Sequence, residues 1–92
     1  MRFEWDEAKR RANLRRHGFD FQRVEEVFAD DTAFTILVDR FTYGEMRFLT
    51  VGVLDGRVVA IAHTETDEVT RVISVRKASR HEKEIYYRKI AD

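Results

Sequence analysis

The sequence predicts an α+β fold with two N-terminal helices, an antiparallel sheet of three to four strands and a C-terminal helix. Apolar residues recur at helical spacing up to about residue 28, and from residue 33 the period changes to two. The strand-like segments are joined by short turns, which favours antiparallel pairing. Because 92 residues support one hydrophobic core, we expect a single domain over residues 1–92.

The two predicted N-terminal helices are bounded by capping residues. Asp6 is a favoured N-cap for the first helix, and Gly18 supplies a left-handed stop after basic residues in the last turn. Asp20 caps the second helix, which ends at Asp30–Asp31. The apolar stripe of this second helix consists of Phe21, Val24, Val27 and Phe28.

Alternating apolar residues predict four strands, over residues 33–38, 46–53, 57–64 and 69–75. Asp55-Gly56 is a strong two-residue hairpin signal between the second and third of these segments. Phe3 is a candidate for a further short edge strand. Ser79 and Glu82 then form a capping box, which predicts a last helix to about Ile90 with Ile85 and Ile90 facing inward.

The composition excludes several classes of protein. The chain has no Cys, which excludes a disulfide framework and any thiolate site. No apolar run approaches the roughly 18 residues of a membrane span, and the acidic, aromatic N-terminus is unlike a signal peptide. We therefore expect a cytoplasmic protein with no membrane partner.

The formal net charge of zero conceals an uneven distribution. Residues 1–18 carry +3 and residues 71–92 carry +4, whereas residues 19–45 carry −5 and residues 46–70 carry −2. The basic ends suit a polyanion, and the acidic segment suits a basic partner, although solvated faces remain an alternative for both.

Three cations bracket the junction between the last strand and the last helix: Arg76, Lys77 and Arg80. Because a helix N-terminus favours anions, fixed cations there make a phosphate-sized site plausible, with a solvated basic rim as the alternative. Strict alternation along the strand places Arg71 and Lys77 on one face and Arg76 on the other.

Three further residues are candidates for chemistry. His63 has the ordinary pKa of a proton-transfer group, and its alternative is a surface or strand-end histidine. Glu45 and Arg47 form a local ion pair or help to orient groups in a site. His63, Glu65 and Asp67 lack the remaining ligands of a usual metal set, so we predict neither a metal site nor a cofactor.

One set of motifs spans nearly the whole chain. It consists of Phe3-Glu4-Trp5-Asp6, Lys9, Asn13, His17-Gly18, Phe21, Val27-Phe28, Asp30, Glu45, Arg47, Gly52, His63-Thr64, Arg71 to Ala78, Arg80 and Glu82. Together these motifs resemble BrnT-type toxins of bacterial type II toxin–antitoxin systems. Departures from the family pattern occur at Arg16, Val75 and Lys77. Lys77 keeps the charge of the family's usual Arg but loses its planar, bidentate guanidinium.

This resemblance implies a RelE-like fold and a ribonuclease toxin that cleaves RNA to inhibit translation and growth. It also implies a cognate antitoxin of the BrnA type, with a ribbon-helix-helix domain through which the heteromeric complex binds operator DNA. The acidic segment 20–45 is a candidate antitoxin-facing surface.

The chemistry of metal-independent RNA cleavage, with the 2′-OH as nucleophile, assigns expected roles to the candidates. Arg76, Lys77 and Arg80 would stabilise transition-state charge, with Arg47 and Arg71 as further cations. His63 is the first acid–base candidate and Glu45 the second. The competing interpretations are a non-catalytic nucleic-acid-binding module and a module that serves only as an antitoxin partner.

Overall fold

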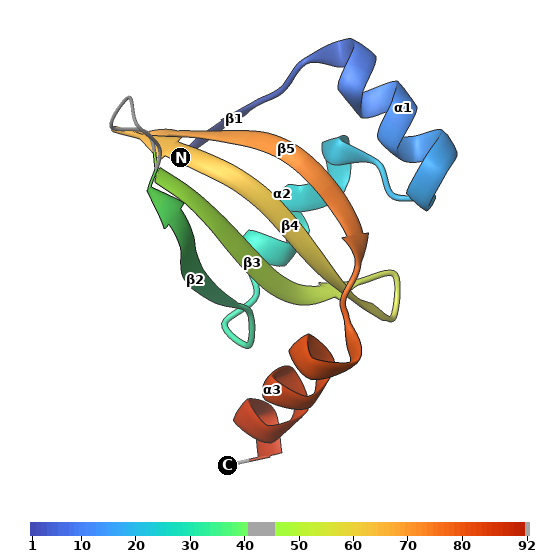
Figure 1. The fold of residues 1–92 in the computed structure, drawn as a ribbon, viewed down its shortest axis with the longest axis vertical. Coiled ribbons are helices and arrows are strands. Elements are labelled where there is room, and N and C mark those ends of the chain that lie inside the picture. The colour runs from blue at the N-terminus through green and yellow to red at the C-terminus, as the bar shows by residue number, and fades with distance from the viewer. Residues whose placement is uncertain (41–45, 92) are drawn as a thin grey trace.

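A computed structural model describes residues 1–40 and 46–91 of the chain. Its sheet has five strands in the order β1-β5-β4-β3-β2 (Figure 1). β1 lies beside β5 at one edge, and α3 lies beyond the end of β5. In chain order the elements are β1 (Arg2–Glu4), α1 (Glu7–His17), the 3₁₀ turn η1 (Phe21–Arg23), α2 (Val24–Phe28), β2 (Phe34–Arg40), β3 (Met46–Leu54), β4 (Arg57–Thr66), β5 (Val69–Lys77) and α3 (Arg80–Ala91).

The sheet corrects the prediction of three to four antiparallel strands. Strands β2 to β5 are antiparallel, but β1 adds a fifth strand that pairs parallel to β5, with Phe3 opposite Thr70. This strand contains Phe3, the candidate for a short edge strand. The parallel orientation of β1 could not be predicted from short turns, because β1 and β5 are separated by α1 and most of the chain.

The N-terminal helices agree with the sequence in position but differ in type. The Asp6 carboxylate accepts hydrogen bonds from the N–H groups of Ala8 and Lys9, and Gly18 is left-handed with φ 81°. The predicted second helix is instead the turn η1 followed by the five-residue α2. Its apolar residues recur every three positions from Phe21 to Val27, which is the period of a 3₁₀ helix.

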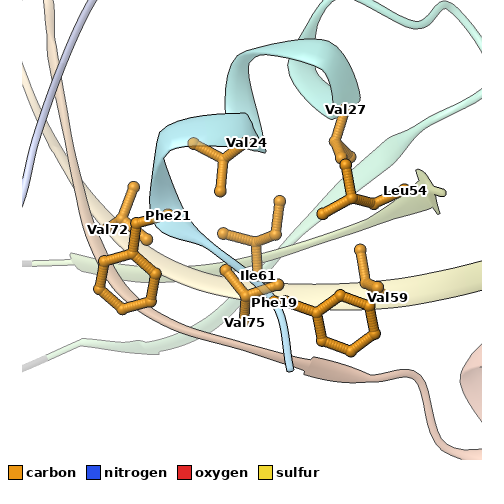
Figure 2. Packing of buried hydrophobic residues seen from close by; sticks show 9 residues of the cluster. All are labelled: Phe19, Phe21, Val24, Val27, Leu54, Val59, Ile61, Val72 and Val75. Carbon is orange, nitrogen blue, oxygen red and sulfur yellow. The ribbon is translucent and has the colours of Figure 1, made fainter. Parts of the chain in front are cut away.

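The sheet has two differently covered faces. The core face packs against η1 and α2, and Figure 2 shows side chains of η1 and α2 lying over those of the sheet. Helix α1 lies against β5, where the Asn13 side chain is bonded to the backbone of Val75. The opposite face, here called the α3 face, packs Val51, Val58 and Ala60 against Tyr86 of α3. The main core consists of Phe19, Phe21, Val24, Val27, Leu54, Val59, Ile61, Val72 and Val75.

A β-bulge changes which residues of β5 share a face. His63 pairs with Val72 while Ala62 pairs with Ser74, so Ile73 is the extra residue. Val72 and Val75 therefore both enter the main core. The expected grouping of Arg71 with Lys77 is consequently wrong, because the bulge places Arg71 on the α3 face.

The last helix begins as the capping box predicts. Glu82 N–H donates to Ser79 Oγ at 3.1 Å, and Ser79 N–H donates to Glu82 Oε1 at 2.7 Å. The inward residue of α3 is Tyr86, 4% exposed, whereas Ile90 is 45% exposed, so the prediction of an inward Ile90 is wrong. The Tyr86 hydroxyl shares a 2.8 Å hydrogen bond with Thr32 Oγ1, which fixes this side of the helix.

Candidate functional site

The junction of β5 and α3 is organised by one ion pair. Arg76 Nη1 and Nη2 donate to the two carboxylate oxygens of Glu82 at 2.9 and 3.0 Å. The Arg76 guanidinium lowers the pKa of Glu82 to about 2, and the hydrogen bond to Glu82 raises the pKa of Arg76. Much of the charge of Arg76 is thus balanced within the protein, and its guanidinium is held in a fixed orientation.

The other two junction cations point elsewhere. The Arg80 side chain is 95% exposed, and its Nε lies 3.5 Å from Glu84 Oε1. Lys77 is paired with Val59, a core-face residue, whereas Arg76 is paired with Ala60 of the α3 face. The structure therefore does not bring the three predicted cations to one point.

The bulge in β5 creates a different grouping of cations. Arg47 of β3 is opposite Thr64 of β4, and Thr64 is opposite Arg71 of β5. Arg47 and Arg71 are therefore separated by one strand, with their backbones about 10 Å apart. Arg76 is on the same face, further along β5, opposite Ala60. We call Arg47, Arg71 and Arg76 the arginine row.

Arg71 is the most accessible member of this row. Its Nη1 donates to Glu4 Oε1 of β1 at 3.1 Å, and both side chains are nearly half exposed. An exposed ion pair of this kind contributes roughly 0 to 1 kcal/mol. A phosphate can therefore compete with Glu4 for Arg71 at little cost to the fold.

His63 lies inside the protein and not at a surface or strand end. It is 1% exposed, between the rings of Phe28 and Phe48 at centroid distances of 5.0 and 5.8 Å. Its Nε2 forms a 2.7 Å hydrogen bond with Thr50 Oγ1, and its Nδ1 forms one of 2.7 Å with Glu65 Oε2. Both ring nitrogens are thus engaged, on the core face, away from the arginine row.

A chain of hydrogen bonds extends from His63 across four strands. Thr50 Oγ1 is bonded to Thr35 Oγ1 at 2.7 Å, and Thr70 Oγ1 donates to Glu65 Oε1 at 2.9 Å. Burial lowers the pKa of His63, although the hydrogen bond to Glu65 opposes this shift. The imidazole therefore favours its neutral form, and the network joins β2, β3, β4 and β5.

Two candidates remain, the acid–base residue Glu45 and the metal-ligand set. Glu45 lies outside the described residues, so its acid–base role stays a prediction. Within residues 1–40 and 46–91, no three His, Asp or Glu side chains are grouped as metal ligands would be.

Sequence reasoning missed three residues that surround Lys77. A cavity of about 220 Å³ lies between the β3–β4 hairpin, the end of β5 and α3. Lys83 and Tyr87 are four residues apart on α3, a spacing that signals a shared helix face. Arg57 follows the predicted hairpin turn directly, but only the tertiary packing brings it to the helix. The lining residues are Gly56, Arg57, Val58, Lys77, Lys83 and Tyr87.

The chain is similar to one family of known proteins, although no curated protein matches it. None of the helices in the described ranges has the length and apolar character needed to cross a bilayer. Residues 5–82 match the family described as "Ribonuclease toxin, BrnT, of type II toxin-antitoxin system", which confirms the resemblance drawn from the motifs. The chain therefore belongs to the BrnT family of type II toxin–antitoxin ribonuclease toxins.

Proposed function

We propose that this protein is an endoribonuclease that cleaves RNA without a metal ion and thereby inhibits translation and growth. Membership of a ribonuclease toxin family supports the reaction class. The observation that carries the proposed site is the arginine row, in which the β5 bulge turns Arg71 to the same face as Arg47 and Arg76.

In the proposed reaction the RNA supplies its own nucleophile. The 2′-oxygen forms a bond to phosphorus as its proton leaves, and the bond from phosphorus to the 5′-oxygen breaks as that oxygen gains a proton. The products are a 2′,3′-cyclic phosphate and a 5′-hydroxyl. Negative charge accumulates on the phosphoryl oxygens, where planar guanidinium groups bind in a bidentate manner.

The remaining candidates take different roles in this proposal. Arg76 is held by Glu82 and stabilises charge from a fixed position, while Arg71 exchanges Glu4 for phosphate. His63 supports the sheet and does not touch RNA, because it is 1% exposed and both its nitrogens are engaged. Glu45 is the proposed acid–base group, and Arg80 attracts RNA from its exposed position at the start of α3.

The test is cleavage of purified RNA by the purified protein in the presence of EDTA. We expect cleavage to persist, and Arg71→Ala to lower the cleavage rate by about 10²-fold, as removal of a fixed oxyanion donor does. Arg76→Lys keeps a cation beside Glu82 but loses the planar, bidentate guanidinium, and we expect the cleavage rate to fall by a similar factor. Arg11→Ala, an exposed arginine of α1, is the control and should cleave normally.

Three outcomes would overturn parts of this proposal. Loss of cleavage in EDTA would contradict metal independence. Unchanged rates for both Arg71→Ala and Arg76→Lys, in variants with normal thermal unfolding, would remove the arginine row from the site. RNA binding without any cleavage would favour the non-catalytic module.

We further propose a partner of the BrnA type, because type II systems pair the toxin with a protein antitoxin. Its ribbon-helix-helix domain would bind operator DNA for the complex. The proposed docking surface on this chain is acidic, and most of its carboxylates lie in or just after α2: Glu25, Glu26, Asp30 and Asp31.

Affinity for the antitoxin tests this surface. Changing those four residues to Gln or Asn should weaken binding at least tenfold in a titration of the purified partner. The control is Asp67→Asn with Glu68→Gln, which removes two charges from the β4–β5 turn instead. Equal affinity of the acidic-surface variant and the wild type would exclude it as the docking site.

A further inference from the structure

We propose that the cavity lined by Arg57, Lys77, Lys83 and Tyr87 binds one nucleotide of single-stranded RNA. The phosphate of this nucleotide is not the one at which the RNA is cleaved. The three cations hold its phosphate, and the Tyr87 ring stacks on its base. This inference rests on the proposed ribonuclease function, since it assigns a binding subsite for that substrate. We call these four residues the nucleotide pocket.

The position of the nucleotide pocket follows from three elements that meet at one end of the sheet. Arg57 begins β4 immediately after the hairpin turn, and Lys77 ends β5 opposite Val59. Ala78 N–H donates to Val58 O at 3.0 Å, which holds the exit of β5 against the start of β4. Lys83 and Tyr87 complete the lining from α3.

The cations of the nucleotide pocket lack the internal counter-ions that Arg71 and Arg76 have. Among the described residues, no carboxylate forms an ion pair with Arg57, Lys77 or Lys83. Three uncompensated positive charges around one cavity raise each other's energy, and an anion relieves this repulsion. The pocket volume of about 220 Å³ equals that of roughly seven liquid waters, which is ample for a phosphate group.

Arg57 is positioned before any ligand arrives. Its guanidinium carbon lies 4.6 Å from the centroid of the Phe19 ring, and Phe19 is 2% exposed within the main core. This cation–π contact restricts the long side chain without neutralising it. Part of the ordering cost of binding is therefore met in the free protein.

Tyr87 offers a surface for a base. It is 54% exposed, and its ring is set edge-on against Tyr86 at a centroid distance of 5.6 Å. Tyr86 is itself buried and bonded to Thr32, so the support beneath Tyr87 is fixed. Aromatic side chains beside cations are the usual platform for single-stranded nucleic acid, because every base has a face that stacks.

The nucleotide pocket is distinct from the arginine row. Lys77 is opposite the core-face residue Val59, while the neighbouring Arg76 is opposite Ala60 of the α3 face. The two side chains leave β5 on opposite faces, so we assign the pocket to a nucleotide next to the reacting phosphate and not to that phosphate itself. Loss of Tyr87 should therefore raise KM and leave kcat nearly unchanged.

Binding is measured with a fluorescent single-stranded 2′-O-methyl RNA of twelve nucleotides, which cannot be cleaved because its 2′-oxygen is blocked. The variant Lys77→Ala/Lys83→Ala should weaken binding about tenfold and reduce the slope of log K against log salt by about 0.7 per phosphate lost. Tyr87→Ala should weaken binding by a similar factor without changing that slope, and Tyr87→Phe should bind like the wild type. Arg88→Ala, elsewhere on α3, is the control for an exposed cation.

Cleavage kinetics separate this inference from the proposed function. If the wild type cleaves RNA and the pocket variants keep its KM and its affinity, the nucleotide pocket is wrong and the ribonuclease function stands. If neither the wild type nor any variant cleaves RNA but the pocket variants lose affinity as expected, the pocket stands as a nucleic-acid site and the ribonuclease function fails. A salt slope unchanged in Lys77→Ala/Lys83→Ala would show that these lysines do not contact phosphate.

Discussion

The Asn13 side chain acts as a strand partner for Val75. Its Nδ2 donates to Val75 O at 2.9 Å, and its Oδ1 accepts from Val75 N–H at 3.1 Å. β1 pairs with β5 only from Val69 to Arg71, so further along the strand these two bonds continue the pairing pattern from a helix. Nδ2 also donates to Phe19 O at 3.1 Å, which ties the end of α1 to the core.

Replacing Asn13 by Ala should therefore destabilise the protein strongly. The change leaves the N–H and C=O of Val75 and the C=O of Phe19 without this partner in a buried setting, where each unsatisfied group costs about 1 to 3 kcal/mol. We expect a loss of about 3 kcal/mol in the free energy of unfolding, measured by urea denaturation. Lys9→Ala, one turn earlier and exposed, is the control, and an Asn13→Ala variant as stable as that control would contradict the assignment.

The Arg76–Glu82 pair should make stability fall in acid. Because the pKa of Glu82 is lowered to about 2 in the folded protein, its contribution is complete above its ordinary pKa of 4.5 and is lost as the pH falls toward 2. Glu82→Gln keeps a capping side chain but loses the charge, at a cost of about 1 kcal/mol at pH 7 after allowance for solvent screening.

Urea titrations at pH 7 and at pH 2 test this expectation. The difference between Glu82→Gln and the wild type should be present at pH 7 and close to zero at pH 2. Glu84→Gln, which alters only the looser pair with Arg80, should match the wild type at both. A Glu82→Gln deficit that is the same at both pH values would mean that the charge is not its cause.

His63 should also make stability depend on pH, in a higher range. Its pKa is lowered by burial, so the unfolded chain binds the proton more tightly than the folded protein does. Stability is complete above about pH 6.5, the ordinary pKa of His, and declines as the pH falls below it. We expect His63→Gln to remove this decline between pH 6.5 and 5.5 and the exposed His81→Gln to keep it, as measured by thermal unfolding. A decline that persists in His63→Gln would assign it to another group.

Gly52 marks a close approach between β3 and α2. A Cβ at this position would lie 2.7 Å from Val27 Cγ1 and 3.1 Å from Ala33 Cβ. Val27 is 0% exposed, so it has little room to move. Gly52→Ala should cost about 1 to 3 kcal/mol, and Val27→Ala in the same chain should recover part of that loss. Additive losses in the double variant, measured by urea denaturation, would contradict a direct clash.

Removing the competitor of phosphate at Arg71 should strengthen RNA binding. Glu4→Gln frees the Arg71 guanidinium and removes one negative charge from its side. We expect about a twofold gain in affinity for the 2′-O-methyl RNA and no change in thermal unfolding, since the pair is exposed. Glu68→Gln is the control for an acidic residue outside the pair, and weaker binding by Glu4→Gln would argue that Glu4 orients Arg71 instead.

The elements that the sequence predicted well are those specified by neighbouring residues. The Asp6 cap, the left-handed Gly18 and the Ser79–Glu82 box depend on contacts within a few positions. Asp55 and Gly56 both adopt positive φ, 53° and 75°, as the hairpin signal requires. Local chemistry thus determined the ends of two helices and the central hairpin.

The parts that could not be predicted depend on distant residues. The parallel β1 has three residues and no periodicity of its own, and its partner lies more than sixty positions away. Lys77 was predicted as a functional cation, but Arg57 joins it only when the hairpin and α3 pack together. His63 could not be recognised as buried, because the aromatic rings around it come from α2 and β3.

The single extra residue in β5 makes this strand tolerant of a shortening at the bulge. Without Ile73, Val72 would directly precede Ser74, and both could keep their present partners, His63 and Ala62. Arg71 would then stay on the α3 face and Val72 in the main core. An in-frame deletion of Ile73 should therefore damage the protein far less than a deletion of Ile61 in β4, where no residue is unpaired and every side chain beyond the gap would change face.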